Sequence, residues 1–197
     1  HRPAAAHDGF PIVRKRGPVA LIGLSTAVPT SPGRSSGRCG AQQLARLAVY
    51  LRSAGDAGLF RVVLLHHPPR AHEAPRHKQL TDAEGFRAVI SEHGAELILH
   101  GHEHRFCYVE LPGPGGRVPV FGVPSASMLP RGDGSAAAQY HLHHIRRRGG
   151  HWSLETHIRI FSREHGRFIE SHRRAVTLPG APIVPPQPHS TATAAVW

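Results

Sequence analysis

Runs of apolar residues divide the chain into two regions with different periodicity. Up to about residue 100, short apolar runs typical of buried strands alternate with stretches of helical periodicity. Strands are expected at residues 19–25, 61–65 and 96–100, helices at 41–54 and from 81 to a stop at 94, and a loop over residues 1–18. Alternation of strands and helices predicts an α/β fold.

The second predicted helix has the clearer end signals. Thr81 and Glu84 fit a capping box, in which the hydroxyl and the carboxylate each accept a hydrogen bond from a free backbone N–H. Phe86 and Ile90 give the helix an apolar face, and Gly94 supplies its stop. These signals predict a helix that packs one side against the sheet.

After residue 106 the pattern changes to short strands separated by turns rich in glycine and proline. The strands are expected at residues 107–111, 118–123, 139–145 and 152–161, in antiparallel hairpins. Residues 178–197 combine proline, alanine and threonine with too little apolar periodicity to pack, so a disordered tail is expected there. The folded domain is therefore expected to span residues 1–177.

Composition places the chain among ordinary globular proteins, with 40% hydrophobic and 19% charged residues. No apolar run approaches the roughly 18 residues of a membrane-spanning helix, so no membrane span is expected. Cys39 and Cys107 are the only cysteines. Two cysteines 68 positions apart make no disulfide framework, which predicts a reducing compartment, the cytoplasm. The oligomeric state stays open.

The net charge of +11 fits an anionic partner such as nucleic acid, a phosphate ester or a membrane surface. The arginines are scattered, however, and form short basic runs only at residues 14–16 and 146–148. We therefore favour a compositional bias and keep nucleic-acid binding as a minor alternative. Eighteen histidines in 197 residues raise the prospect of metal chemistry without defining a site.

Histidines follow two of the predicted buried strands at the point where each strand ends. His66 and His67 follow the strand at 61–65, and His102 and His104 alternate in the loop after residue 100. Carboxyl ends of strands are where open α/β sheets generally place their sites. Neutral imidazoles held on such short loops are suited to a dinuclear hydrolytic centre.

The sequences VVLLHHPP at 62–69 and LILHGHEHRF at 97–106 resemble the last two motifs of the calcineurin-like metallophosphoesterases. The closest similarity is to the bacterial cyclic-nucleotide-phosphodiesterase-like branch, over about residues 19–161. The resemblance implies a four-layer αββα sandwich, of which this chain would hold the C-terminal part. It also implies hydrolysis of a phosphoester substrate, either a small molecule or a nucleotide. Phosphodiesters are favoured over phosphomonoesters.

The resemblance also implies roles for individual histidines. His66 and His102 resemble ligands of the second metal, and His104 resembles a ligand of the first, with iron, manganese or zinc as the two ions. His67 is expected to support a ligand or to contact substrate. The family's D-x-H, GD and GNH[DE] motifs have no match before His66. The resemblance therefore implies a truncated chain that lacks the upstream ligands and is inactive alone.

Other histidines and acids near these motifs have simpler interpretations. His141 and His143 would share one face of a strand, but no carboxylate or cysteine accompanies them, so an exposed strand face is expected. His100 is expected to be packed or hydrogen-bonded, and Glu103 to be solvated. For the chain as a whole, a basic module that binds polyanions or nucleic acid and an inactive remnant remain as alternatives.

Overall fold

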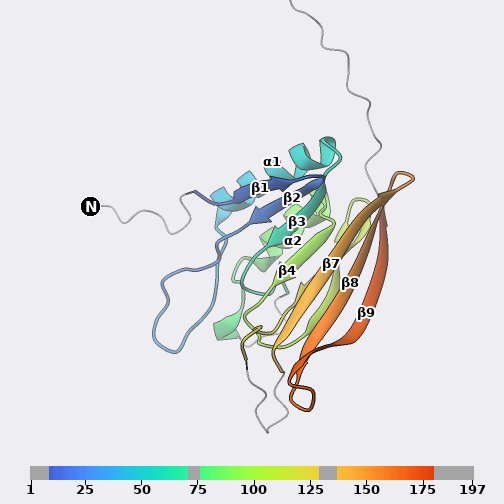
Figure 1. The fold of residues 1–197 in the computed structure, drawn as a ribbon. Coiled ribbons are helices and arrows are strands. Elements are labelled where there is room, and N and C mark those ends of the chain that lie inside the picture. Colours follow the sequence, from blue (N-terminus) through green and yellow to red (C-terminus); the bar gives the residue numbers. More distant parts are fainter. Residues whose placement is uncertain (1–8, 71–75, 129–136, 180–197) are drawn as a thin grey trace, which may run out of the picture.

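Two β-sheets and two helices make up the computed structural model, which describes residues 9–70, 76–128 and 137–179 (Figure 1). The larger sheet has six strands in the order β1-β2-β3-β4-β6-β5. Its strands are β1 (Ile12–Arg16), β2 (Val19–Gly23), β3 (Phe60–Leu64), β4 (Leu97–His100), β5 (Cys107–Gly113) and β6 (Gly116–Gly122). The smaller sheet contains β7 (Gln139–Arg148), β8 (His151–Ser162) and β9 (Arg167–Pro179).

The centre of the larger sheet is parallel. Strands β2, β3, β4 and β6 run in the same direction, while β1 and β5 pair antiparallel at the two edges. Helices α1 (Ala41–Asp56) and α2 (Ala83–His93) connect β2 to β3 and β3 to β4, and the short 3-10 helix η1 (Arg76–Lys78) precedes α2. The predicted α/β alternation is confirmed by these crossovers.

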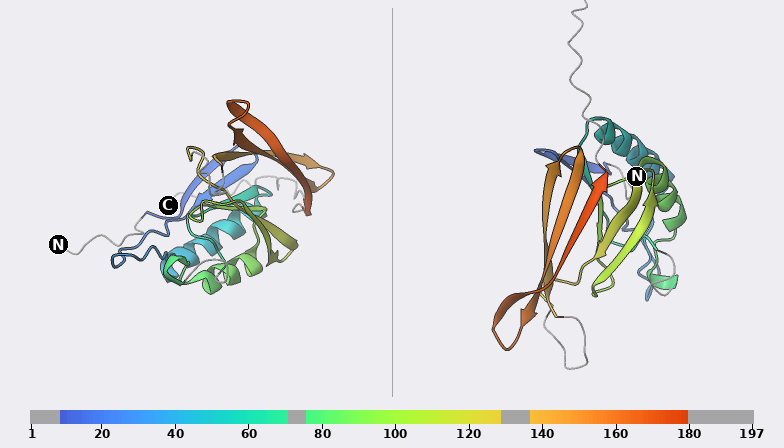
Figure 2. Two further views of the ribbon diagram at one scale, coloured as in Figure 1. Left: turned by 90° about the horizontal axis from the view of Figure 1, so that it is seen from below. Right: turned by 90° about the vertical axis from the view of Figure 1, so that its right-hand side faces the viewer.

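The molecule has three layers, with the six-stranded sheet in the middle (Figure 2). On one face of this sheet, Leu47 and Leu51 of α1 and Phe86 and Ile90 of α2 are buried against strand side chains such as Val63. The opposite face packs against β7–β9 through a second apolar cluster. Its buried members are Phe60, Val62, Leu97, Phe121, Trp152, Leu154 and Leu178. Both faces of the parallel strands are thus buried, as their continuous apolar runs require.

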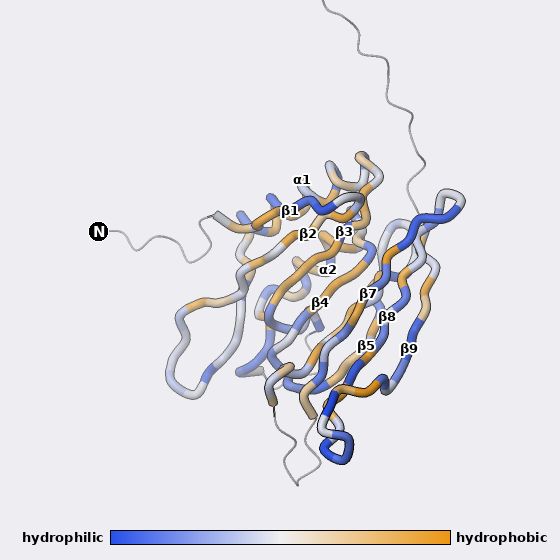
Figure 3. Tube along the Cα trace, viewed as in Figure 1, coloured by the Kyte–Doolittle hydropathy of each residue, from blue (hydrophilic) through white to orange (hydrophobic). Residues whose placement is uncertain are grey.

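Along β7–β9 hydrophilic residues are interspersed with hydrophobic ones (Figure 3), and in the described ranges no helix lies over the outer face of this sheet (Figure 2). Glu155 forms ion pairs with Arg146 and Arg173 on this face and accepts a hydrogen bond from His157. A packed helix would need an apolar face there instead. The described residues therefore form three layers, where the family resemblance implies four.

Two strands escape the sequence pattern. Residues 12–16 form β1, although a loop is expected up to residue 18. The strand was not predicted because Arg14, Lys15 and Arg16 are consecutive charged residues, which hide the alternation of apolar and polar positions and are tolerated at an open sheet edge. Strand β9 is also missed, because its exposed positions are basic and few of its residues are buried. It runs two residues past the expected domain boundary at 177. The rest of the expected tail lies outside the described residues.

The start of α2 differs from the predicted capping box. Its N-cap is Asp82, whose carboxylate accepts hydrogen bonds from the backbone N–H groups of Cys39 and Gly40, 2.9 and 2.7 Å away. The Thr81 hydroxyl donates to the carbonyl of Gly37. These groups join α2 to the start of α1 rather than capping their own helix. Gly94 ends α2 as predicted. Neither helix has the length and apolarity needed to cross a bilayer.

Candidate metal centre

The histidine loops meet at the carboxyl ends of β3 and β4. These strands are neighbours in the parallel ladder, and the pairing continues past them: the N–H of Leu65 donates to Leu99, and that of Gly101 donates to His66. The two loops are therefore held side by side by backbone hydrogen bonds. The side chains of His66 and His102 extend from this junction toward each other.

The imidazoles of His66 and His102 are in direct contact. His66 Nε2 and His102 Nδ1 lie 3.1 Å apart, and the ring planes cross at 77°. Two imidazole nitrogens that bind one tetrahedral zinc ion at its usual bond lengths are about 3.3 Å apart. One ligand nitrogen from each of His66, His67 and His102 lies within 4.8 Å of the others. This spacing fits side chains that share a metal ion.

His67 differs from the other two because both of its ring nitrogens have protein partners. Nε2 lies 2.8 Å from the carbonyl oxygen of Ser35, so Nε2 carries the proton and donates it. Nδ1 then accepts from the hydroxyl of Thr26, 2.7 Å away. Gly37 lies so close to the ring that a Cβ there would collide with it. His67 is thus buried and fixed by the protein on both sides of its ring, and burial lowers its pKa.

His102 is held by an unusual loop conformation. Both His102 and His104 have left-handed backbones, with φ of 72° and 52°. For residues other than glycine, this costs on the order of 1–3 kcal/mol each and is commonest at functional sites. Nε2 of His102 is buried and, in the described part of the chain, has no hydrogen-bond partner. Nε2 is not the nitrogen that faces His66, so an ion bound to Nε2 would differ from one shared with His66 through Nδ1.

The electrostatics of the cluster keep His102 neutral. Burial, together with the nearby charges of His67, His66, Lys78 and His104, lowers the pKa of His102 to about 4. A neutral imidazole offers a lone pair at physiological pH, which is the form that binds metals. His104 is exposed and lies outside the close group of three. Its expected ligand role, like those of His66 and His102, stays a prediction.

One residue at the end of β4 and one in the loop that follows test the simpler interpretations. His100 is buried, and its Nδ1 lies 3.1 Å from the carbonyl of Gly101, as expected for a packed residue. Glu103 was expected to be solvated, and that prediction is wrong. Its side chain is only 12% exposed, Oε1 is buried, and Oε2 lies 3.4 Å from the guanidinium of Arg105. The left-handed residues on either side turn this carboxylate back toward the protein.

The expected exposure of His141 and His143 is also wrong. Both rings lie between the two sheets, 5.6 Å from the ring of Phe121. Gln139 Nε2 donates to His141, and His143 bonds to the Thr156 hydroxyl. Burial lowers the pKa of both histidines to about 4. Strand periodicity shows which residues share a face, but it does not show which face is buried.

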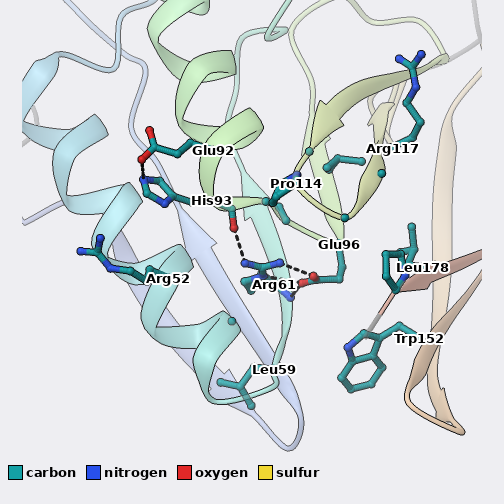
Figure 4. Close-up of a pocket in the computed structure, with 18 of the residues that line it drawn as sticks. Arg52, Leu59, Arg61, Glu92, His93, Glu96, Pro114, Arg117, Trp152 and Leu178 are labelled. Carbon is teal, nitrogen blue, oxygen red and sulfur yellow. Dashed lines mark hydrogen bonds and ion pairs between the residues drawn. The ribbon is translucent and has the colours of Figure 1, made fainter. Parts of the chain in front are cut away.

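A cavity of about 400 Å³ lies at the opposite end of the parallel strands (Figure 4). At its centre, Arg61 binds Glu96 through two hydrogen bonds, and it also donates to the carbonyl of His93. Trp152 and Leu178 form an apolar wall of the cavity. The central arginine and glutamate are satisfied by the protein itself, so this cavity holds no counterpart of the histidine cluster.

Comparisons with known proteins give only distant similarities. No protein-family model matches the chain, and no curated protein matches it. A dimetal phosphatase from Danio rerio superposes with a TM-score of 0.46 at 12% identity, over 73% of this chain and 39% of the phosphatase. Vps29 from Chaetomium thermophilum superposes with a TM-score of 0.33 at 13% identity, over 91% of this chain and 66% of Vps29. The chain thus spans less than two thirds of either protein.

Proposed function

We propose that this chain is part of a metal-dependent phosphoester hydrolase and supplies histidine ligands to its metal centre. The observation that carries the proposal is the pair formed by His66 and His102, which meet at neighbouring strand ends with His66 Nε2 and His102 Nδ1 3.1 Å apart. The motifs that contain these residues resemble those of the metallophosphoesterases and support the same chemistry. By that resemblance, a phosphodiester of a small molecule or nucleotide is the favoured substrate.

In this proposal, His66 and His102 hold one ion, and His104 holds a second, with iron, manganese or zinc at each position. Such ions supply Lewis acidity toward phosphoryl oxygens and lower the pKa of a bound water. The protein contributes by holding its imidazoles neutral and fixed. His67, anchored by Thr26 and Ser35, fills the space behind the cluster and limits the movement of the ligand rings.

The centre requires more ligands than the close group offers. Within the described residues, the side chains near enough to share one ion are three imidazoles and no carboxylate. Dinuclear hydrolytic centres use carboxylates as well, so the proposal places the remaining ligands outside the described residues. The 197-residue chain alone is then expected to bind metal weakly and to lack appreciable turnover. In the complete enzyme, a further helical layer would make the four-layer sandwich.

Metal binding can be tested directly on the purified chain by following cobalt(II) absorption and zinc calorimetry. Loss of a contact that supports a metal ligand typically weakens metal binding by about 10- to 100-fold. His66→Ala and His102→Ala each remove a proposed ligand, so each should weaken metal binding by more than that. His144→Ala is the matched control, because His144 is exposed on the outer face of β7. Equal losses in the control, or no metal binding by the unsubstituted chain, would contradict the proposed centre.

Activity gives a separate test. The chain should not hydrolyse bis-p-nitrophenyl phosphate appreciably when manganese is added. Substantial manganese-dependent turnover that disappears in His102→Ala would contradict the proposal that ligands are missing while it supports the hydrolase class. Metal binding without turnover in any longer form of the protein would favour the inactive remnant.

A further inference from the structure

The outer face of the three-stranded sheet is a long and open surface. Strand β8 has 12 residues, which at the usual rise per residue gives a face about 40 Å long. Figure 2 shows this sheet as the outermost layer, with its other face turned toward the rest of the molecule. The surface is therefore large enough to bind an extended ligand along its strands.

Positive charge is concentrated in this sheet. Residues 139–179 contain eight arginines and three glutamates, a net charge of +5 within 41 residues. The glutamates on the outer face are already paired: Glu155 lies 3.3 Å from Arg146 and 3.4 Å from Arg173, and Glu170 lies 3.2 Å from Arg173. The remaining outward arginines, exposed Arg148 and half-buried Arg159, leave an excess of cations on this face.

Aromatic side chains share the same face at the end near the β8–β9 turn. The ring centroids of Tyr140 and Phe168 are 4.9 Å apart, and those of Phe161 and Phe168 are 5.6 Å apart. All three residues are partly exposed. Tyr140 lies opposite Arg159 in the strand register, which places both side chains on the same face of the sheet. We call Tyr140, Phe161, Phe168 and the outward arginines the outer basic face.

We propose that the outer basic face binds single-stranded nucleic acid. Arginines neutralise phosphates, and aromatic rings on a sheet provide platforms on which unpaired bases stack. A duplex buries its base faces and could use only the charge, so the aromatic residues favour a single strand. The length of the face suits several nucleotides, within the site sizes of other single-sheet binders. This activity is independent of the proposed metal centre.

The test uses the 197-residue chain and a fluorescein-labelled 20-mer of deoxythymidine, with binding measured by fluorescence anisotropy from 50 to 300 mM NaCl. Arg148→Gln/Arg159→Gln should weaken binding at least tenfold at 50 mM NaCl. If each arginine contacts one phosphate, the slope of log affinity against log salt should fall by about 1.4. Phe161→Leu/Phe168→Leu, which keeps the surface apolar, should weaken single-strand binding at least fivefold while duplex binding changes little.

Arg14→Gln/Arg16→Gln on the remote strand β1 is the matched control, since it removes the same charge and its arginines donate to adjacent backbone carbonyls. His66→Ala should also bind normally, which separates this proposal from the metal centre. Circular dichroism and thermal melting check that each variant is folded. Equal losses in the β1 control, or equal affinity for single strand, duplex and heparin, would overturn the proposal in favour of nonspecific attraction to polyanions.

Discussion

His67 shows how far a motif can specify a site at the scale of single residues. The adjacent histidines of the HHPP segment are alike in sequence, yet His66 faces His102 while His67 is locked by Thr26 and Ser35. His66 and His102 are predicted to come together because they follow the carboxyl ends of neighbouring strands. The partners of His67 come from a long loop more than 30 positions away, and no local pattern marks them.

Gly37 provides a test of that support. In Gly37→Ala, the new methyl group would collide with the His67 ring, so the ring must move. His67 would then no longer pack behind the rings of His66 and His102. We expect the cobalt affinity of the chain to fall by about 10- to 100-fold, as when other supporting contacts of metal ligands are removed. Gly23→Ala is the control, because its added Cβ would make only an ordinary contact with Ile12. Unchanged cobalt affinity in Gly37→Ala would show that His67 does not support the ligands.

At the scale of elements, the periodic segments were predictable and the irregular ones were not. Both helices appear where their apolar positions recur, and the predicted strands of the parallel sheet lie within two residues of their expected ends. Strands β1 and β9 were missed because each is an edge strand, and edges tolerate the charges that hide alternation. The N-terminus of α2 was misread because Thr81 and Asp82 bond to a distant loop.

The Arg61–Glu96 pair joins four elements at the amino ends of the strands. Arg61 on β3 binds the carboxylate of Glu96 before β4 and the carbonyls of Leu51 in α1 and His93 in α2. Both side chains are largely buried, at 13% and 9% exposure. In Glu96→Gln, the guanidinium would keep its charge in this buried place without a counter-ion.

We therefore expect Glu96→Gln to lower the free energy of unfolding by about 3–5 kcal/mol, measured by urea denaturation. Glu92→Gln is the matched control, because the Glu92 side chain is 76% exposed and pairs only with His93, 3.7 Å away. The control should change stability by no more than about 0.5 kcal/mol. Similar values for both variants would mean that the Arg61–Glu96 pair contributes little to the free energy of unfolding.

At the scale of the whole molecule, the contact between the two sheets carries a pH dependence. His141 and His143 are enclosed there, and their pKa values of about 4 lie below the ordinary value of 6.5. The folded state therefore keeps them neutral where the unfolded chain takes up protons. Their contribution to stability is present above pH 6.5 and is lost as the pH falls toward 4.

Urea denaturation at several pH values between 7.5 and 4.5 measures this effect. Between pH 6.5 and 4, each histidine can lower the free energy of unfolding by at most about 1.4 kcal/mol per pH unit, and by less because both rings keep some contact with solvent. In His141→Gln/His143→Gln the decline should be shallower, since neither side chain takes up a proton. A decline as steep as that of the unsubstituted chain would assign it to other groups.

The two apolar faces of the central sheet also differ in when they can be covered during synthesis. The helices that cover one face lie between its strands in sequence, so that side can close as soon as β6 leaves the ribosome. Phe60, Val62, Leu97 and Phe121 on the other face must wait for Trp152, Leu154 and Leu178, which are translated later. A nascent chain stalled near residue 128 would therefore display a bare aliphatic and aromatic surface. Such a surface is a target for chaperones and, without them, a starting point for aggregation.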